Sequence, residues 1–142
     1  MLMKFVWSEL LKYKFGDDYM QYWLVVGSRD FNDYALLATT LNEMRNGSDD
    51  ICIVSGGAKG ADSLAKQYAF NQHLAYVEFP ARWDVYGKSA GYRRNVEMHK
   101  YIAQYDDRKV IAFWDGKSKG TQHNFGLAEK YNTELKIINY VN

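Results

Sequence analysis

Residues 53–65 read IVSGGAKGADSLA, in which an apolar run is followed by a glycine-rich turn and by the small and apolar residues of a helix start. The apolar run begins at Ile51, and a short run without polar interruptions is typical of a strand buried on both faces of a sheet. Beyond Gly60 the apolar residues recur at helical spacing to about His73. The stretch therefore predicts a strand, a tight turn and a helix, the repeating unit of a parallel sheet.

The same alternation continues on both sides of this stretch. Further apolar runs lie at residues 22–26, 75–79, 109–114 and 135–141, and helical patterns cover about 33–45, 93–104 and 121–131. Strands that are apolar throughout and alternate strictly with helices favour a parallel sheet covered on both faces. We therefore expect an α/β fold with a parallel sheet of about five strands, formed by a single domain over residues 21–142.

The first 20 residues do not belong to this alternation. Val6, Leu10 and Lys14 share one face at helical spacing, which predicts an N-terminal helical extension over residues 1–20. Charged residues interrupt the apolar stretch and exclude the core of a signal peptide, and no run approaches the roughly 18 apolar residues of a membrane span. We expect a cytoplasmic protein that does not contact a membrane.

Composition narrows the classes of partner. The 142 residues include 18 basic and 17 acidic side chains, a net charge of +1, which disfavours binding to duplex nucleic acid. The single cysteine, Cys52, excludes an intrachain disulfide and suits a reducing compartment. Twelve tyrosines and four tryptophans supply apolar surface with a polar group, either in the core or at a pocket or an oligomer interface.

Three loops follow predicted strands and combine glycine with basic or hydroxyl-bearing residues. Ligands of parallel sheets bind at the carboxyl ends of the strands, where glycine lets backbone N–H groups approach an anion and a helix N-terminus adds positive potential. The candidate ligand-binding residues in these loops are Gly27, Ser28, Arg29, Ser55, Gly56, Gly57, Ala58, Lys59, Gly60, Asp62, Lys119, Gly120 and Thr121.

Each of these loops has an ordinary structural explanation as well. The spacing GGxxG is neither a Walker A loop nor a dinucleotide-binding GxGxxG, Asp62 is favourable in any first helical turn, and Thr121 can be an N-cap. The argument for a ligand rests on the recurrence of such loops at three strand ends. We infer an anion-binding site there.

The segment 82–98 reads RWDVYGKSAGYRRNVEM and lies between the second and third loops. Arg93 and Arg94 are predicted to open a helix, where the helix dipole disfavours cations, so their presence indicates a bound anion. Trp83 and Tyr86 can stack on a nucleobase or cover the edge of the sheet. These four residues and Asn95 complete the candidate ligand-binding set.

Taken together, GSRD at residues 27–30, SGGAKGAD at 55–62, the 83–98 segment and GKSKGT at 116–121 resemble the SLOG superfamily, and most of all its small single-domain YspA-like proteins. The resemblance covers about residues 22–140. It implies a Rossmann-like three-layer fold and a nucleotide-derived ligand bound by a SLOG-like domain. Relatives include the LOG phosphoribohydrolases, which cleave the glycosidic bond of cytokinin nucleotides, and DprA, which binds single-stranded DNA.

LOG enzymes carry a catalytic arginine in R-K-x-x-M and a catalytic glutamate in P-G-G-x-G-T-x-x-E. Arg94 matches the arginine, but the glutamate position is Asn124, and an amide cannot act as a carboxylate acid or base. Hydrolysis would therefore need Glu97 or Asp62 beside Arg94. We expect binding without turnover, and no metal or cofactor.

The resemblance implies a sensor or sequestering protein for an ADP-ribose-like, NAD-derived or cyclic-nucleotide-like signal, bound in a glycine-rich phosphate pocket. One alternative is an N-glycosidase or phosphoribohydrolase acting on a nucleotide, and a second is DprA-like binding of single-stranded nucleic acid. The expected partners are a nucleotide-derived small molecule and further copies of the chain, as a homodimer or higher homo-oligomer.

Overall fold

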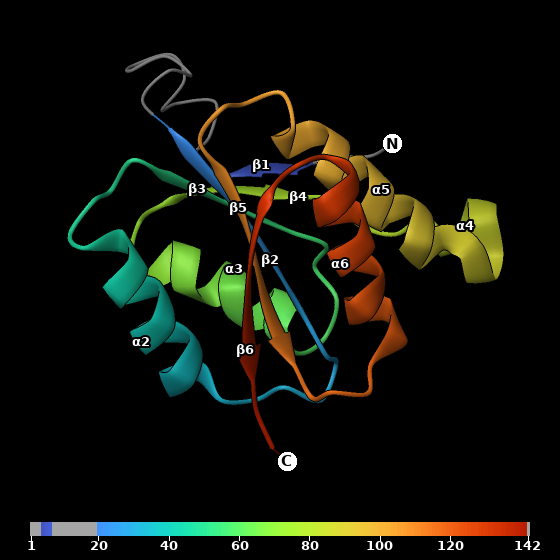
Figure 1. Ribbon diagram of the computed structural model, residues 1–142, viewed down its shortest axis with the longest axis horizontal. Helices are drawn as coiled ribbons and strands as arrows, with labels where there is room; N and C mark the ends of the chain where they lie inside the picture. Colours follow the sequence, from blue (N-terminus) through green and yellow to red (C-terminus); the bar gives the residue numbers. More distant parts are fainter. Residues whose placement is uncertain (1–3, 7–19, 142) are drawn as a thin grey trace.

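The computed structural model describes the backbone of residues 4–6 and the complete residues 20–141 (Figure 1). The elements in chain order are β1 (Lys4–Val6), β2 (Gln21–Gly27), α2 (Tyr34–Arg45), β3 (Ile51–Ser55), α3 (Ala61–Asn71), β4 (Ala75–Glu78), α4 (Trp83–Tyr86), the 3-10 helix η2 (Gly87–Ser89), α5 (Ala90–Ile102), β5 (Arg108–Trp114), α6 (Lys119–Lys130) and β6 (Glu134–Asn139).

The strands form one sheet in the order β1-β4-β3-β2-β5-β6, in which β2 to β6 are parallel. After β2 the chain adds β3 and β4 on one side, and it then returns to the other side of β2 to add β5 and β6. The loops that leave β2 and β5 therefore run to opposite faces of the sheet. Such a reversal opens a crevice beyond the carboxyl ends of the two strands, where Gly27 pairs with Phe113.

Two apolar layers cover the sheet, as the uniformly apolar strands predict. Trp23 and Val25 point to one face, which is packed by α2 and α3, and Leu24 and Val26 point to the other, which is packed by α5 and α6 (Figure 1). All four side chains are at least 97% buried. The expected Rossmann-like three-layer fold, with a parallel sheet of five strands, is confirmed.

The expected helix over residues 1–20 is wrong at Lys4–Val6. These residues form a strand antiparallel to β4, with Lys4 opposite Glu78 and Val6 opposite Tyr76. The physical reason is that the edge of β4 presents backbone N–H and C=O groups, and an added strand satisfies them. The rest of the expected extension, residues 1–3 and 7–19, lies outside the described residues.

The segment before α5 is more helical than the sequence indicates. It contains α4 and η2, and α5 begins at Ala90 rather than at Arg93. Arg93 and Arg94 therefore lie about one turn inside the helix, so the dipole argument for a bound anion at these residues does not hold. Across the described part of the chain, no helix has the length and hydrophobicity needed to span a membrane.

Candidate functional site

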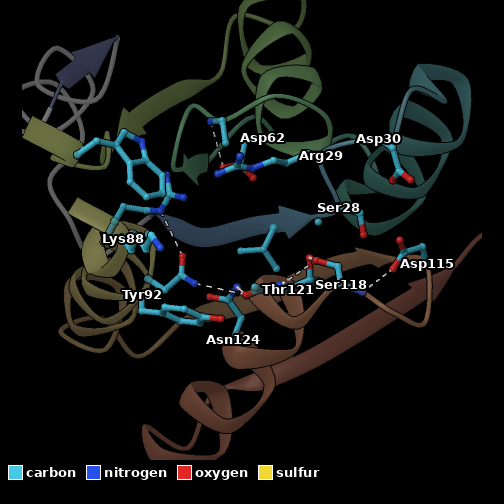
Figure 2. A pocket seen from close by; sticks show the side chains of 18 residues that line it. Ser28, Arg29, Asp30, Asp62, Lys88, Tyr92, Asp115, Ser118, Thr121 and Asn124 are labelled. Atoms are coloured by element: carbon cyan, nitrogen blue, oxygen red, sulfur yellow. Dashed lines mark hydrogen bonds between the residues drawn. The ribbon is translucent and has the colours of Figure 1, made fainter. Parts of the chain in front are cut away.

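A cavity of about 520 Å³ lies at the carboxyl ends of β2 and β5, where the order of the strands reverses (Figure 2). Its volume is within the range of ligand pockets, about 300–1,000 Å³. The residues that line it are Val26, Gly27, Ser28, Arg29, Asp30, Ala58, Asp62, Trp83, Lys88, Gly91, Tyr92, Arg94, Asn95, Asp115, Ser118, Gly120, Thr121 and Asn124.

The N-terminus of α6 forms one wall of the cavity. Ser118 is the N-cap, and its hydroxyl oxygen accepts a hydrogen bond from the Thr121 N–H at 3.3 Å. Thr121 is therefore not the cap. Asp115 accepts hydrogen bonds from the N–H groups of Ser118 and Lys117 at 2.8 and 2.9 Å, and these bonds lower its pKa. Gly120 adds no side chain, so the positive end of α6 is open to a ligand.

Ser28 lies directly after β2 and is 3% exposed. Its backbone is held on both sides: its N–H donates to Phe113 O at 3.2 Å, and its C=O accepts from the Phe31 N–H at 3.2 Å. Its Oγ forms no hydrogen bond within 3.5 Å among residues 20–141, although the Ser28 hydroxyl still interacts with the Asp115 carboxylate and the Tyr140 hydroxyl, in both cases lowering the pKa of the partner. Figure 2 shows this side chain at the cavity near Asp115. A buried hydroxyl that no hydrogen bond satisfies costs about 1–3 kcal/mol.

Arg94 reaches the cavity from α5 and is 8% exposed. Its Nη1 donates to Gly56 O at 2.8 Å, and its Nε donates to Asn95 Oδ1 at 3.2 Å. A Cβ at Gly56 would lie 2.2 Å from Nη1, so a side chain at this position would displace the guanidinium. Gly56 is thus explained by Arg94 rather than by a phosphate.

The other glycines of the turn have similar explanations. Gly57 has φ +71°, and its Cβ would lie 2.6 Å from the Glu78 carboxylate carbon. Gly60 has φ +85°, and its Cβ would lie 2.2 Å from Ser28 O. The absence of side chains in the turn therefore makes room for other parts of the protein. Gly60 lines neither this cavity nor the smaller one beside it.

Asp62 stands at the start of α3 and faces the cavity opposite α6 (Figure 2). Its Oδ2 accepts a hydrogen bond from the Ala58 N–H at 3.3 Å. The protein's own carboxylate thus uses an N–H of the glycine-rich turn that the sequence analysis assigned to an anion. Burial raises the pKa of Asp62 to about 6, and the positive charge of Arg94 acts in the opposite direction.

The raised pKa of Asp62 predicts a pH dependence of stability. The Asp62 carboxyl has a pKa of 3.8 in the unfolded chain, so the folded protein binds its proton more tightly. The protonated carboxyl therefore contributes its full stabilisation of the fold below about pH 4, and this contribution is lost as the pH rises to about 6. The loss is roughly 3 kcal/mol. We expect Asp62→Asn to abolish this decline in urea denaturation at pH 4, 5, 6 and 7; equal slopes for the variant and the wild type would contradict the assignment.

The structure divides the sequence-predicted residues into three groups. Those that line the cavity are Gly27, Ser28, Arg29, Ala58, Asp62, Trp83, Arg94, Asn95, Gly120 and Thr121. Gly56, Gly57 and Lys59 line only the smaller cavity. Those that line neither are Ser55, Gly60, Tyr86, Arg93, Lys119 and Glu97.

Geometry explains why residues of the third group are outside. Ser55 is fully buried below the turn, where its hydroxyl is within hydrogen-bond distance of Asp62 O and the Tyr76 hydroxyl. Arg93 points away from the cavity, with its guanidinium 4.5 Å from the centre of the Tyr86 ring. Neighbouring residues on a helix face different directions, so only Arg94 of the pair enters the site.

Several lining residues were not found from the sequence. They are Val26, Asp30, Lys88, Gly91, Tyr92, Asp115 and Ser118. Lys88, Gly91, Tyr92 and Asn95 follow the helical pattern i, i+3, i+4, i+7, so a helix predicted to start earlier would have placed them on one face. Asp115 and Ser118 belong to the loop before the last helix, whose lysine, glycine and threonine were selected as candidates, but these two residues were not.

Asn124, which stands where LOG enzymes carry their glutamate, is 2% exposed and lines the cavity. Its Nδ2 donates to Gly120 O at 3.2 Å, and its Oδ1 lies 3.0 Å from His99 Nε2. Burial lowers the pKa of His99 to about 4, so the ring is neutral at pH 7, and we assign its Nε2–H as the donor to Asn124. Asn124 therefore joins α5 to the first turn of α6.

Among the described residues, no group of three or more His, Cys, Asp or Glu side chains could hold a metal ion. The polar groups that remain in the cavity are hydroxyls, carboxylates, amides and three cations, Arg29, Lys88 and Arg94. Such a set can bind phosphate and sugar hydroxyls.

Comparisons with known proteins agree with this architecture. The profile of the YspA, cpYpsA-related SLOG family (YAcAr) matches residues 24–86. Gene 61 protein of Mycobacterium phage D29 is 31% identical over 123 residues, which cover 82% of this chain and 94% of the phage protein. A solved structure of DNA processing protein A from Helicobacter pylori, described for its single-stranded DNA binding mode, has a TM-score of 0.59 at 20% identity, over 95% of this chain and 70% of its own.

The last comparison corrects one expectation. The expected partner was a nucleotide-derived small molecule, with single-stranded nucleic acid as a second alternative, whereas the Helicobacter pylori protein that shares this fold is described for its binding of single-stranded DNA. The limit of the expected partner to small molecules is therefore wrong. The residue motifs, the fold and the identity with the phage protein together show that the chain belongs to the YspA, cpYpsA-related SLOG family.

Proposed function

We propose that this protein binds a nucleotide unit in the cavity beyond β2 and β5, as a sensor or sequestering protein. The observation that carries the proposal is the Ser28 hydroxyl, which is buried in the cavity wall and forms no hydrogen bond within 3.5 Å among residues 20–141. It lies on the same cavity as the N-terminus of α6 and the guanidinium of Arg94. Each of the three is a group that can donate a hydrogen bond to a phosphate oxygen.

The charges of the cavity favour a phosphate with a sugar attached over inorganic phosphate. Three basic residues line it, and so do three acidic ones, Asp30, Asp62 and Asp115. Carboxylates repel a bare anion but accept hydrogen bonds from ribose hydroxyls, as the acidic residue of dinucleotide-binding folds does. A nucleotide offers both groups.

Aromatic side chains stand at the rim of the cavity. Trp83 is 49% exposed and Tyr92 is 47% exposed. Arg29 lies 5.8 Å from the centre of the Trp83 ring, and Tyr92 packs edge-on against His123 at 4.7 Å. Exposed aromatic rings beside cations provide stacking surfaces for nucleobases, at about 1–3 kcal/mol per base.

The nucleotide unit can belong to either of two kinds of ligand. One is a soluble ADP-ribose-like, NAD-derived or cyclic-nucleotide-like molecule, in keeping with the cavity's mixture of carboxylates and cations. The other is a single strand, which is favoured by the fold shared with the DNA-binding protein of Helicobacter pylori. Titration calorimetry with AMP, ADP-ribose, cyclic AMP and a short single-stranded oligonucleotide distinguishes them.

Ser28→Ala is expected to lower the affinity for the bound nucleotide about tenfold, because one hydrogen bond to a charged oxygen is lost. The same change should alter the free energy of unfolding little, since no hydrogen bond within 3.5 Å is lost. Ser63→Ala, an exposed serine of α3 outside the cavity, is the matched control. Equal affinities of wild type and Ser28→Ala would remove the main support for the proposal.

The titrated samples also test hydrolysis. Asp62 and Arg94 line the cavity together, whereas Glu97 does not line it. Chromatography of the samples detects any free base. Release of base that is lost in Asp62→Asn would replace the binding proposal with a hydrolase, in which Asp62 protonates the leaving base and water adds to the sugar.

A further inference from the structure

A second cavity, of about 330 Å³, adjoins the first. Arg29, Ala58, Trp83 and Arg94 line both cavities, so these four residues form the boundary between them. Beyond the boundary, the walls of the second cavity come from the glycine-rich turn after β3 and from residues 78–81 at the end of β4.

The second cavity has a charge different from that of the first. Arg29, Lys59 and Arg94 line it, and Glu78 is the acidic residue among its lining. The Glu78 carboxylate is already satisfied inside the protein, because Tyr76 Oη donates to its Oε1 at 2.8 Å and Lys66 Nζ lies 3.3 Å from the same oxygen. The second cavity is therefore an anion-attracting space with a basic excess, whereas the charges of the first are balanced.

The shape of the second cavity also suits a nucleotide. Gly57 and Lys59 of the turn are exposed at the wall, whereas Gly56 is buried against Arg94. Trp83, Pro80 and Ala81 provide the apolar part of the lining. Trp83 is half exposed and borders both cavities, so its ring can contact a group on either side.

We propose that the two cavities hold two consecutive sugar–phosphate units of one ligand, which are joined through phosphate and of which at least one carries a base. This inference rests on the proposed function of the first cavity and extends it. Arg29 and Arg94 stand at the boundary, where the linking phosphate passes, and Lys59 binds a phosphate of the second unit. The linkage is a phosphodiester in a single strand or a pyrophosphate in a soluble ligand such as ADP-ribose, and both place negative charge at the boundary.

Joining the two units makes binding of the second intramolecular, which raises affinity by about 10²–10⁴ when the linker fits. The test compares AMP, ADP-ribose and the 5′-phosphorylated dinucleotide d(pApA) by titration calorimetry with the full chain. We expect at least one two-unit ligand to bind 100-fold or more tightly than AMP. The tighter of the two identifies the source, with d(pApA) representing a single strand and ADP-ribose a soluble ligand.

Lys59→Ala probes the second cavity alone, since Lys59 does not line the first. It is expected to lower the affinity for the tighter two-unit ligand about tenfold, and the affinity for AMP much less. Lys117→Ala, an exposed lysine outside both cavities, is the charge-matched control and should change neither.

The outcomes separate the two proposals. The second cavity is not a subsite if AMP binds as tightly as both two-unit ligands. The same holds if Lys59→Ala lowers the affinity for AMP and for the two-unit ligands by the same factor. Either result overturns this inference but leaves the proposal of nucleotide binding in the first cavity intact. If none of the probes binds, the proposed function itself is wrong.

Discussion

Gly60→Ala is expected to lower the free energy of unfolding by about 3–4 kcal/mol, a fall in melting temperature of about 10 °C or more. The new Cβ would lie 2.2 Å from Ser28 O and 2.7 Å from Arg29 Cα, and both are backbone atoms that cannot move aside as a side chain can. The φ of +85° adds strain of about 1–2 kcal/mol for a residue with a Cβ. Urea denaturation followed by circular dichroism measures the loss.

Substitutions at two other glycines distinguish the steric clash of the new Cβ from the backbone strain of a positive φ. Gly116 has φ +83° but no atom within 4 Å of its Cβ position, so Gly116→Ala should lose about 1–2 kcal/mol from strain alone. Gly126 lies inside α6 with open space around it, and Gly126→Ala should gain about 0.5–1 kcal/mol from helix propensity. A loss at Gly60 no greater than that at Gly116 would show that the contact between the turn and Ser28 is not rigid.

Arg94→Ala is expected to weaken nucleotide binding 100-fold or more, because this guanidinium borders both cavities. The variant should also lose roughly 2 kcal/mol of stability with the charge-assisted hydrogen bond to Gly56 O. The pKa of Asp62 should rise further, since the positive charge of Arg94 now lowers it. Calorimetry with the tightest ligand found measures the first effect, and denaturation across pH measures the other two.

Arg93→Ala is the matched control, because it removes the same charge from the adjacent residue. Arg93 lines neither cavity and contacts Ser89 and Tyr86, so its loss should change affinity by less than about threefold. If both arginine variants weakened binding equally, the effect would be the general attraction of a basic surface. The site described above would then not be the cause.

The residues of the candidate site illustrate how far a sequence can predict a pocket. Ser28, Arg29, Asp62 and Thr121 lie within a few residues of strand ends, so the rule that ligands bind there was enough to find them. Lys88 and Tyr92 lie on η2 and α5, before the predicted helix start, and only the earlier start of α5 brings them to the cavity.

The glycine-rich turn shows the opposite case. Its composition indicates a backbone that something approaches closely, and this is correct, but the approaching groups are Arg94, Glu78 and the Ser28 carbonyl. A phosphate and a guanidinium can each approach the backbone closely only where the residue has no Cβ. Glycine spacing alone therefore could not identify the neighbour.

The alternation of strands and helices can be predicted from the residues alone, because the periodicity of apolar residues is a local property that burial enforces in each segment. The same pattern predicts that polar loops meet at the carboxyl ends of the strands. Which groups face each other there depends on how the helices pack on the sheet. Arg94 contacts Gly56 across 38 positions of the chain, and the orientation of α5 on the sheet selects Arg94 over Arg93. Helix orientation depends on packing between residues that are distant in the sequence, so it cannot be predicted from a local pattern.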